Sequence, residues 1–160
     1  LVGSEMCIRD RFTSVQERQV QFLLDCLSHI TGHTYSMING ICSLADTNGK
    51  LTLILEVLPN ENALLLAKPM SKIPSEPTAL ASRATQLLAI NAQPTLMRGS
   101  WFAINEDALT LLLLKMLDLS TVSEESFLHV LADFFDLAEH LYTWLEHDEC
   151  DVQPIPYTIA

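Results

Sequence analysis

Six side chains near the end of the chain carry atoms that bind metal ions, and they form the densest chemically capable cluster in the sequence: His140, Glu146, His147, Asp148, Glu149 and Cys150. Imidazole, thiolate and carboxylate groups are the ligands that zinc takes in proteins. The alternative is that the histidines lie on the solvent side of a helix and that the acidic run beyond them is hydrated. We favour this alternative because ligands at a fraying helix end have no fixed neighbours to orient them. The sequence therefore predicts no metal site and no cofactor.

Other histidines and cysteines do not form a catalytic arrangement. His29 and His33 are four residues apart, but Gly32 between them is expected to end a helix, so they need not share a face. A cysteine nucleophile needs an adjacent base, whereas Cys26 falls in an apolar helix pattern and Cys42 in a strand, where inert buried thiols are common. Phosphate-binding loops, the GxSxG elbow and the HExxH pair do not occur. We therefore predict no catalytic residues and a protein that is not an enzyme.

The composition points to a folded, acidic protein. The chain has 160 residues, 49% of them hydrophobic, and a net charge of −11, so it can form one folded domain whose field repels nucleic acid and anionic lipid. No apolar run approaches the ~20 residues of a membrane span, and the four scattered cysteines are typical of a reducing compartment. We expect a cytoplasmic protein without nucleic-acid binding or membrane insertion, whose acidity favours a partner segment carrying lysine and arginine.

Both ends of the chain are expected to lie outside the domain. Residues 1–11, LVGSEMCIRDR, show no periodicity and look like a non-native segment translated from a sequencing adapter. Residues 148–160 contain two prolines and are expected to be a flexible tail. This leaves residues 12–147 as a single domain.

Periodicity and turn residues predict three helices and five strands. Ser14 and Glu17 have the spacing of a capping box, and apolar residues recur every three to four positions from Val20 to Gly32, which predicts the first helix. Turn signals and a proline-rich link at 69–77 separate the remaining elements. These are strands at 35–45, 51–58 and 63–67, a helix at 78–91, a hairpin of strands at 95–104 and 108–117, and an amphipathic helix at 124–146.

The order α-βββ-α-ββ-α with short connections predicts an α+β fold built on a five-stranded antiparallel sheet. A sheet with one hydrated face should alternate apolar and polar residues, yet Leu53-Ile54-Leu55 and Leu111 to Leu114 are continuously apolar. Trp101 and Phe102 are adjacent in a strand and therefore point to opposite faces. Both faces of the sheet thus need covering, and we expect a second copy or a foreign chain to complete the burial.

This arrangement resembles the class I type III secretion chaperones, the Tir-chaperone-like, CesT-type family. The resemblance covers about residues 14–147 and is carried by the strand LTLILEVLP, the helix LASRATQLLAIN, the hairpin GSWFAINEDALTLLLLKML and the helix EESFLHVLADFFDLAEHLYTWLE. It implies a homodimer in the bacterial cytosol that holds the N-terminal segment of a secreted effector protein in extended form and delivers it to the secretion apparatus. Pairing at a sheet edge and apolar pockets would supply the binding.

The resemblance also implies which residues make contacts. The first helix and early strands would receive the effector, through Phe22, Cys26, Ile54 and Leu58. The second helix and the strand after it would form the dimer interface, through Leu80, Leu87, Leu88 and Trp101. A different class of function remains open, namely a small dimeric ligand-sensing or regulatory domain, which would need an enclosed pocket with convergent polar groups.

Overall fold

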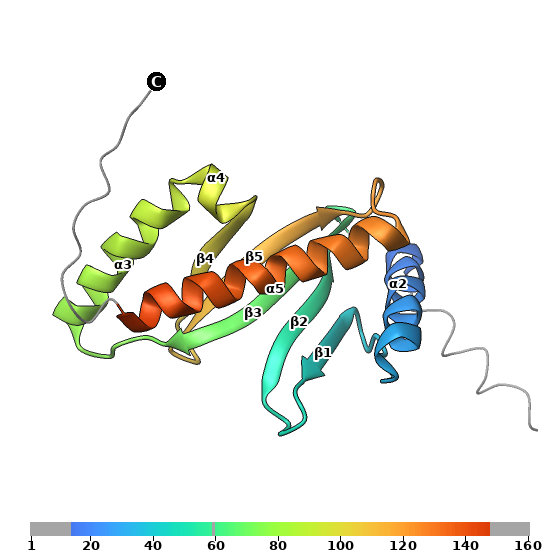
Figure 1. Cartoon of the computed structure of the whole chain (residues 1–160), viewed down its shortest axis with the longest axis horizontal. Coiled ribbons are helices and arrows are strands. Elements are labelled where there is room, and N and C mark those ends of the chain that lie inside the picture. Colours follow the sequence, from blue (N-terminus) through green and yellow to red (C-terminus); the bar gives the residue numbers. More distant parts are fainter. Residues whose placement is uncertain (1–13, 59, 148–160) are drawn as a thin grey trace, which may run out of the picture.

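The computed structural model describes residues 14–58 and 60–147. In these residues four helices and five strands follow one another: α2 (Val15–Thr31), β1 (Ile41–Ala45), β2 (Leu51–Leu58), β3 (Ala63–Lys72), α3 (Pro77–Asn91), α4 (Pro94–Met97), β4 (Ser100–Asn105), β5 (Thr110–Asp118) and α5 (Glu124–His147) (Figure 1). The predicted α+β class and antiparallel sheet are confirmed. None of these helices is long and apolar enough to cross a bilayer. Residues 1–11 and the tail at 148–160 lie outside the described part.

Helix α2 begins and ends where its sequence signals indicate. The Ser14 hydroxyl accepts a hydrogen bond of 3.0 Å from the Glu17 N–H, which satisfies a free donor of the first turn. Gly32 adopts the left-handed conformation with φ of 72° and donates its N–H to the Ser28 carbonyl at 2.9 Å. The buried residues Val20, Leu23 and Leu24 hold the helix against the core.

The prediction of a strand at 35–45 is wrong for the first half of this range. Asn39 and Gly40 both have positive φ, 53° and 78°, as the two central residues of a tight hairpin turn require. Ile38 and Ile41 exchange main-chain hydrogen bonds of 2.8 and 3.1 Å across this turn. Chain direction therefore reverses at Asn39-Gly40, and strand β1 begins only at Ile41.

Two further boundaries differ from the sequence prediction. Strand β3 continues through Pro69 to Lys72, although this stretch was expected to be a linker, because β5 pairs with it beyond the proline and a register shift between Pro69 and Ser71 accommodates it. Residues 94–97 form the one-turn helix α4 and not the start of a strand, since Pro94 opens a helical turn and Arg98 and Gly99 close it with positive φ. This turn is the one described helix that the sequence prediction lacks.

The strands are ordered β1-β2-β3-β5-β4. Every neighbouring pair is antiparallel, so β4 runs parallel to β3 with β5 between them. The connection through α3 and α4 carries the chain across to the outer edge, and the β4–β5 hairpin then returns it beside β3. Strands β1 and β4 are consequently the two edges of the sheet.

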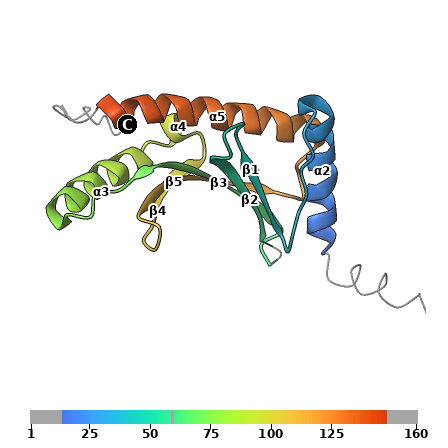
Figure 2. The same ribbon diagram turned by 90° about the horizontal axis from the view of Figure 1, so that it is seen from below.

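Helix α5 covers one face of the sheet, which we call the inner face. Phe127, Phe134 and Leu141 on α5 are buried against Leu55 and Leu113 of the strands in a single apolar core. Edge-on, α5 runs along one side of the sheet, α2 stands across its β1–β2 end, and α3 lies at the β4 end (Figure 2). None of the described helices crosses the middle of the opposite side, which we call the outer face.

The Asn91 side chain bonds the end of α3 to the β4 edge, in addition to the burial of Leu87 and Ile90. The Asn91 Oδ1 accepts a hydrogen bond of 2.7 Å from the Phe102 N–H, and its Nδ2 donates one of 3.1 Å to the Phe102 carbonyl. Asn91 thus takes the place of a neighbouring strand residue at an edge that would otherwise present unpaired main-chain groups. At the other end of α3, the carboxylate of Glu76 caps the helix by accepting from Thr78 N–H and Ala79 N–H at 2.9 and 2.6 Å.

Candidate functional site

The outer face carries a row of apolar residues that crosses four strands. Register places Ile54 of β2 opposite Ala67 of β3, Ala67 opposite Leu114 of β5, and Leu114 opposite Trp101 of β4. All four point away from α5, because their strand neighbours Leu55, Leu66, Leu113 and Phe102 are the buried ones on the inner face. The row is a continuous apolar band across the sheet.

Further apolar residues widen this band. Leu65 and Met116 are paired in the next row, and Leu112 is paired with Ala103 in the row on the other side. Met116 leaves 50% of its surface exposed and the others are partly exposed. An uncovered face of this composition is typical of a protein that buries it against another chain.

The two sheet edges differ in how they are protected. Asn91 occupies the β4 edge, whereas β1 pairs only with β2 and with the single Ile38 bridge among the described strands. A polar pocket of about 280 Å³ lies along β1, between residues 33–35 and residues 43–47. The main chain of β1 is therefore open to pairing with an added strand.

An apolar pocket of about 240 Å³ lies between α3 and β4, and Ala84, Leu87, Leu88, Asn91, Phe102, Ala103, Ile104 and Leu111 line it. Leu87 is 4% exposed and belongs to the core, while Leu88 is 69% exposed at the rim. A large apolar side chain with this exposure, beside an apolar pocket, favours contact with another protein surface.

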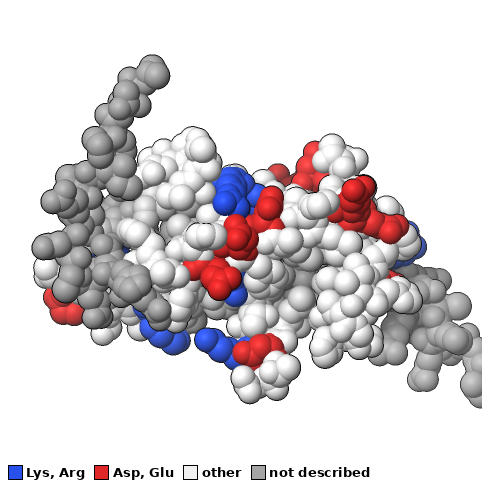
Figure 3. Space-filling model, in the orientation of Figure 1, with Lys and Arg blue, Asp and Glu red and all other residues white. Residues whose placement is uncertain are grey.

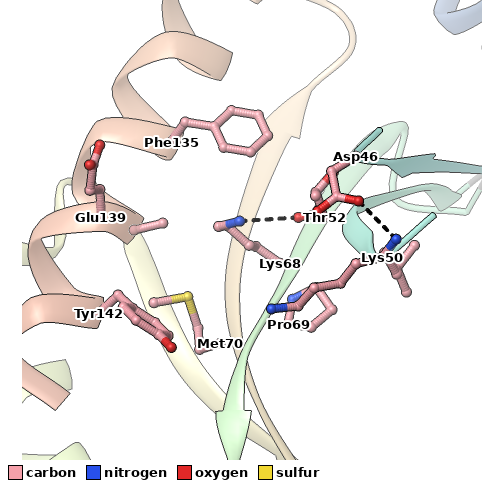
Figure 4. Close-up of a pocket in the computed structure, with 11 residues that line it drawn as sticks. Asp46, Lys50, Thr52, Lys68, Pro69, Met70, Phe135, Glu139 and Tyr142 are labelled. Carbon is pink, nitrogen blue, oxygen red and sulfur yellow. Dashed lines mark hydrogen bonds between the residues drawn. The ribbon is translucent and has the colours of Figure 1, made fainter. Parts of the chain in front are cut away.

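A third pocket, of about 370 Å³, lies where β2 and β3 separate beneath α5 (Figure 4). The Lys68 ammonium points into it, donates to the Thr52 carbonyl at 3.3 Å and lies 5.0 Å from the centre of the Phe135 ring. Burial lowers the pKa of Lys68, and the nearby charge of Lys50 lowers it further. Glu139 and Tyr142 of α5 face the pocket from the other side.

Acidic residues gather on the exposed side of α5 (Figure 3). Asp133, Asp136 and Glu139 are all exposed there. Arg98 neutralises part of this charge through an ion pair of 3.0 Å with Asp136, whose carbonyl also contacts His140 Nδ1 at 2.8 Å. This surface favours cationic over anionic partners.

The structure places the predicted effector residues on two different surfaces. Ile54 and Leu58 lie on the outer face of β2. Phe22 is exposed on α2, and Cys26, one turn further along, lies near Glu124 at the start of α5. Helix α2 packs against α5 and β2. Phe22 and Cys26 on this helix therefore do not share one surface with Ile54 and Leu58 on the outer face.

The predicted dimer residues also separate. Leu80 packs against the core and Leu87 is inside it, whereas Leu88 is exposed. Trp101 and Phe102 point to opposite faces as predicted, and Trp101 lies in the same outer row as Ile54. Of the four residues predicted for the dimer interface, Leu88 is exposed on α3 and Trp101 lies on the outer face.

The thiols and histidines show no arrangement for chemistry in the described part of the chain. Burial raises the pKa of the Cys42 thiol, and desolvation followed by Glu124 raises that of Cys26, so both disfavour the reactive thiolate. Among the side chains that the structure describes, in residues 14–58 and 60–145, no three metal-ligating groups come together. Of the predicted cluster, the side chains of Glu146 and His147 and the whole of Asp148, Glu149 and Cys150 lie outside the described part.

Sequence reasoning missed two features of these surfaces. The sequence places Asn91 only at the end of the helix predicted at 78–91, although an asparagine at a helix end can bond a nearby main chain. The separation of β2 and β3 was also missed, although Pro69 was a signal, because proline in a strand indicates a side without a pairing partner.

Comparison with known proteins agrees with this architecture. The model of the Tir chaperone protein (CesT) family matches residues 27–142. The chain is similar in fold to a structure described as the ExsC-ExsE complex, with a TM-score of 0.66 and 20% identity over 79% of this chain and 93% of the other. It is also similar to a HopA1-SchA chaperone-effector complex, with a TM-score of 0.62 and 17% identity over 79% and 95%.

A third similar structure is the Yersinia pestis type III secretion chaperone SycH with a fragment of YscM2, with a TM-score of 0.54 and 17% identity over 76% of this chain and 98% of the other. No curated protein sequence matches the chain.

Proposed function

This chain belongs to the Tir chaperone protein (CesT) family, and from that premise we propose that it is a type III secretion chaperone. It binds the N-terminal segment of a secreted effector in extended form in the bacterial cytosol and delivers it to the secretion apparatus. The observation that carries this proposal is the uncovered apolar band on the outer face. An exposed apolar surface of this kind marks a site that binds another protein chain.

The effector segment lies across the outer face and along the β1 edge. Ile54 is in register with Ser43 of β1, so the apolar band ends beside the edge strand whose outer side is open to pairing among the described strands. Main-chain pairing at β1 gives affinity for many sequences, and the apolar band selects side chains. We keep Ile54 and Leu58 as effector contacts on this face, and Phe22 and Cys26 as contacts for a part of the segment that passes α2.

A homodimer forms through α3 and β4. Leu88 of one copy packs beside the α3–β4 pocket of the other copy. A two-fold axis relates the two copies, so the Leu88 side chain of each is buried in the same way. Leu80 and Leu87 shape this surface from beneath, and Trp101 contributes at its outer side. A Leu88→Arg variant is expected to shift the mass from dimer to monomer. Ile30→Arg, at a site with a similar exposed fraction on α2, is expected to leave the dimer intact.

Effector capture is tested by co-expressing the chain with N-terminal segments of candidate effectors and measuring the purified species by size-exclusion chromatography with light scattering. The expected result is a stable complex of a dimer with one segment. Met116→Glu, which puts a charge on the outer face, should reduce capture, while Leu96→Glu on α4, with similar exposure, should not. A monomer that captures no segment would contradict both parts of the proposal.

A further inference from the structure

The sheet is split between β2 and β3. Their pairing runs from Leu58 opposite Ala63 to Ile54 opposite Ala67 and then stops. Among the described strands, β3 continues beyond that point to Lys72 with β5 as its only partner, while Leu51 and Leu53 of β2 pair only with β1. Main-chain groups of both strands therefore face each other across the pocket of about 370 Å³.

The Lys68 side chain bonds a main-chain acceptor at the edge of this split. Its ammonium donates to the Thr52 carbonyl at 3.3 Å, an acceptor that a neighbouring strand would otherwise satisfy. An ammonium has three donors, and neither Lys68 nor Lys50 forms an ion pair with a carboxylate of the described residues. A segment that displaces Lys68 from Thr52 must therefore give the half-buried cation a new acceptor.

The acidic residues around the pocket do not already serve this purpose. Asp46 Oδ1 accepts from the N–H groups of Asn48 and Lys50 at 2.8 and 2.9 Å and is committed to the turn. Glu139 lines the opposite wall without pairing with Lys68.

Helix α5 provides a partly apolar roof. Phe135, Ala138 and Tyr142 line the α5 side of the pocket, with the buried Met70 below them. Lys68 and Met70 are two residues apart on β3 and both point toward α5 (Figure 4). A strand laid beside β3 would present residues i and i+2 to this roof, one facing Lys68 and the other facing Met70.

We propose that the split between β2 and β3 is a docking slot for an extended peptide segment that carries an acidic residue followed two positions later by an apolar one. The segment lies along the free side of β3 at residues 68–72, where Pro69 offers a carbonyl but no N–H. Its carboxylate binds the ammonium of Lys68, and its apolar side chain packs against Met70 beneath Phe135. This slot deepens the proposed chaperone function by naming a class of partner segment, and it is separate from the outer face and the β1 edge.

The test uses the full chain and two fluorescein-labelled heptapeptides, STEVLTS and STQVLTS, with binding measured by fluorescence anisotropy. The glutamate peptide is expected to bind wild-type protein about tenfold more tightly than the glutamine peptide, because a charge-assisted hydrogen bond is stronger than a neutral one. Lys68→Met should abolish this difference, and Lys68→Arg should retain most of it.

Lys115→Met is the matched control. Lys115 is also half buried, with a pKa lowered by desolvation, but it lies beside Arg98 and outside the pocket. The Lys115→Met variant should bind the glutamate and the glutamine peptide with the same affinities as the wild-type protein. Hydrogen exchange should show protection of the amides at residues 70–72 when the glutamate peptide is bound.

Three results would contradict the proposed slot. These are no binding of either peptide, equal affinity of both peptides for wild-type protein, or an equal change in the ratio of the two affinities in Lys68→Met and Lys115→Met. Failure of effector capture with normal heptapeptide binding would instead count against the chaperone function and leave the slot standing.

Discussion

Replacing Asn91 with leucine is expected to weaken the attachment of α3 to the sheet. Leucine has a similar size but cannot accept from the Phe102 N–H or donate to the Phe102 carbonyl, the two bonds of 2.7 and 3.1 Å that Asn91 makes. Phe102 is 5% exposed, so water cannot readily replace these bonds. Each lost hydrogen bond costs about 1 kcal/mol, which gives a loss of about 2 kcal/mol in the free energy of unfolding.

The assay is urea denaturation followed by circular dichroism. For a chain of this size the loss corresponds to a fall in Tm of about 4–8 °C. Asn91→Asp keeps an acceptor for the Phe102 N–H but sets an anionic oxygen against the Phe102 carbonyl. It should therefore be no more stable than Asn91→Leu at neutral pH. Gln93→Leu is the control, since Gln93 forms no capping hydrogen bond through its side chain.

Amide exchange separates this explanation from a general packing defect. In Asn91→Leu the Phe102 amide should exchange much faster while the amides of β2 and β3 keep their relative protection. The reasoning would be refuted if Asn91→Leu were no less stable than Gln93→Leu, or if exchange rose uniformly across the sheet. Because α3 also carries Leu88, the same variant should weaken the proposed dimer.

Three further perturbations test other parts of the fold. Phe134→Ala should lower the free energy of unfolding by about 3–5 kcal/mol in urea denaturation because Phe134 is buried in the core; a cost below that of a surface substitution would contradict this. Ser14→Ala should cost about 1 kcal/mol by removing the cap to the Glu17 N–H, whereas Ser14→Asp should restore it. Hydrogen bonds from Thr78 N–H and Ala79 N–H lower the pKa of Glu76, so its stabilising contribution is complete above about pH 4.3 and is lost as the pH falls through the folded-state pKa. The Tm difference between wild type and Glu76→Gln should therefore shrink from pH 7 toward pH 3, and a difference independent of pH would contradict the assignment.

Local chemistry made much of the fold predictable. Helix α2 is bounded by Ser14 and Gly32 because capping and left-handed geometry depend on the residue at that position and on nearest neighbours. The long apolar and polar faces of α5 follow from the helical period alone. Asn39-Gly40 carried an equally local turn signal and was overlooked within a strand pattern. The opposite orientations of Trp101 and Phe102 followed from the pleat.

Site geometry depended on contacts between distant parts of the chain. Alternation shows that Ile54, Leu114 and Trp101 each lie on one face of a strand, but only the strand order and register align them in one row. Similarly, the sequence marks Pro69 as a weak strand position, yet the slot beside Lys68 exists only because β2 turns away from β3 while β5 continues to pair with it. Apolar pattern and capping are properties of neighbouring residues, so the sequence by itself determined the elements and the acidity of the protein. Which faces meet and which stay open is set by the packing of all elements together, and only the tertiary structure decided it.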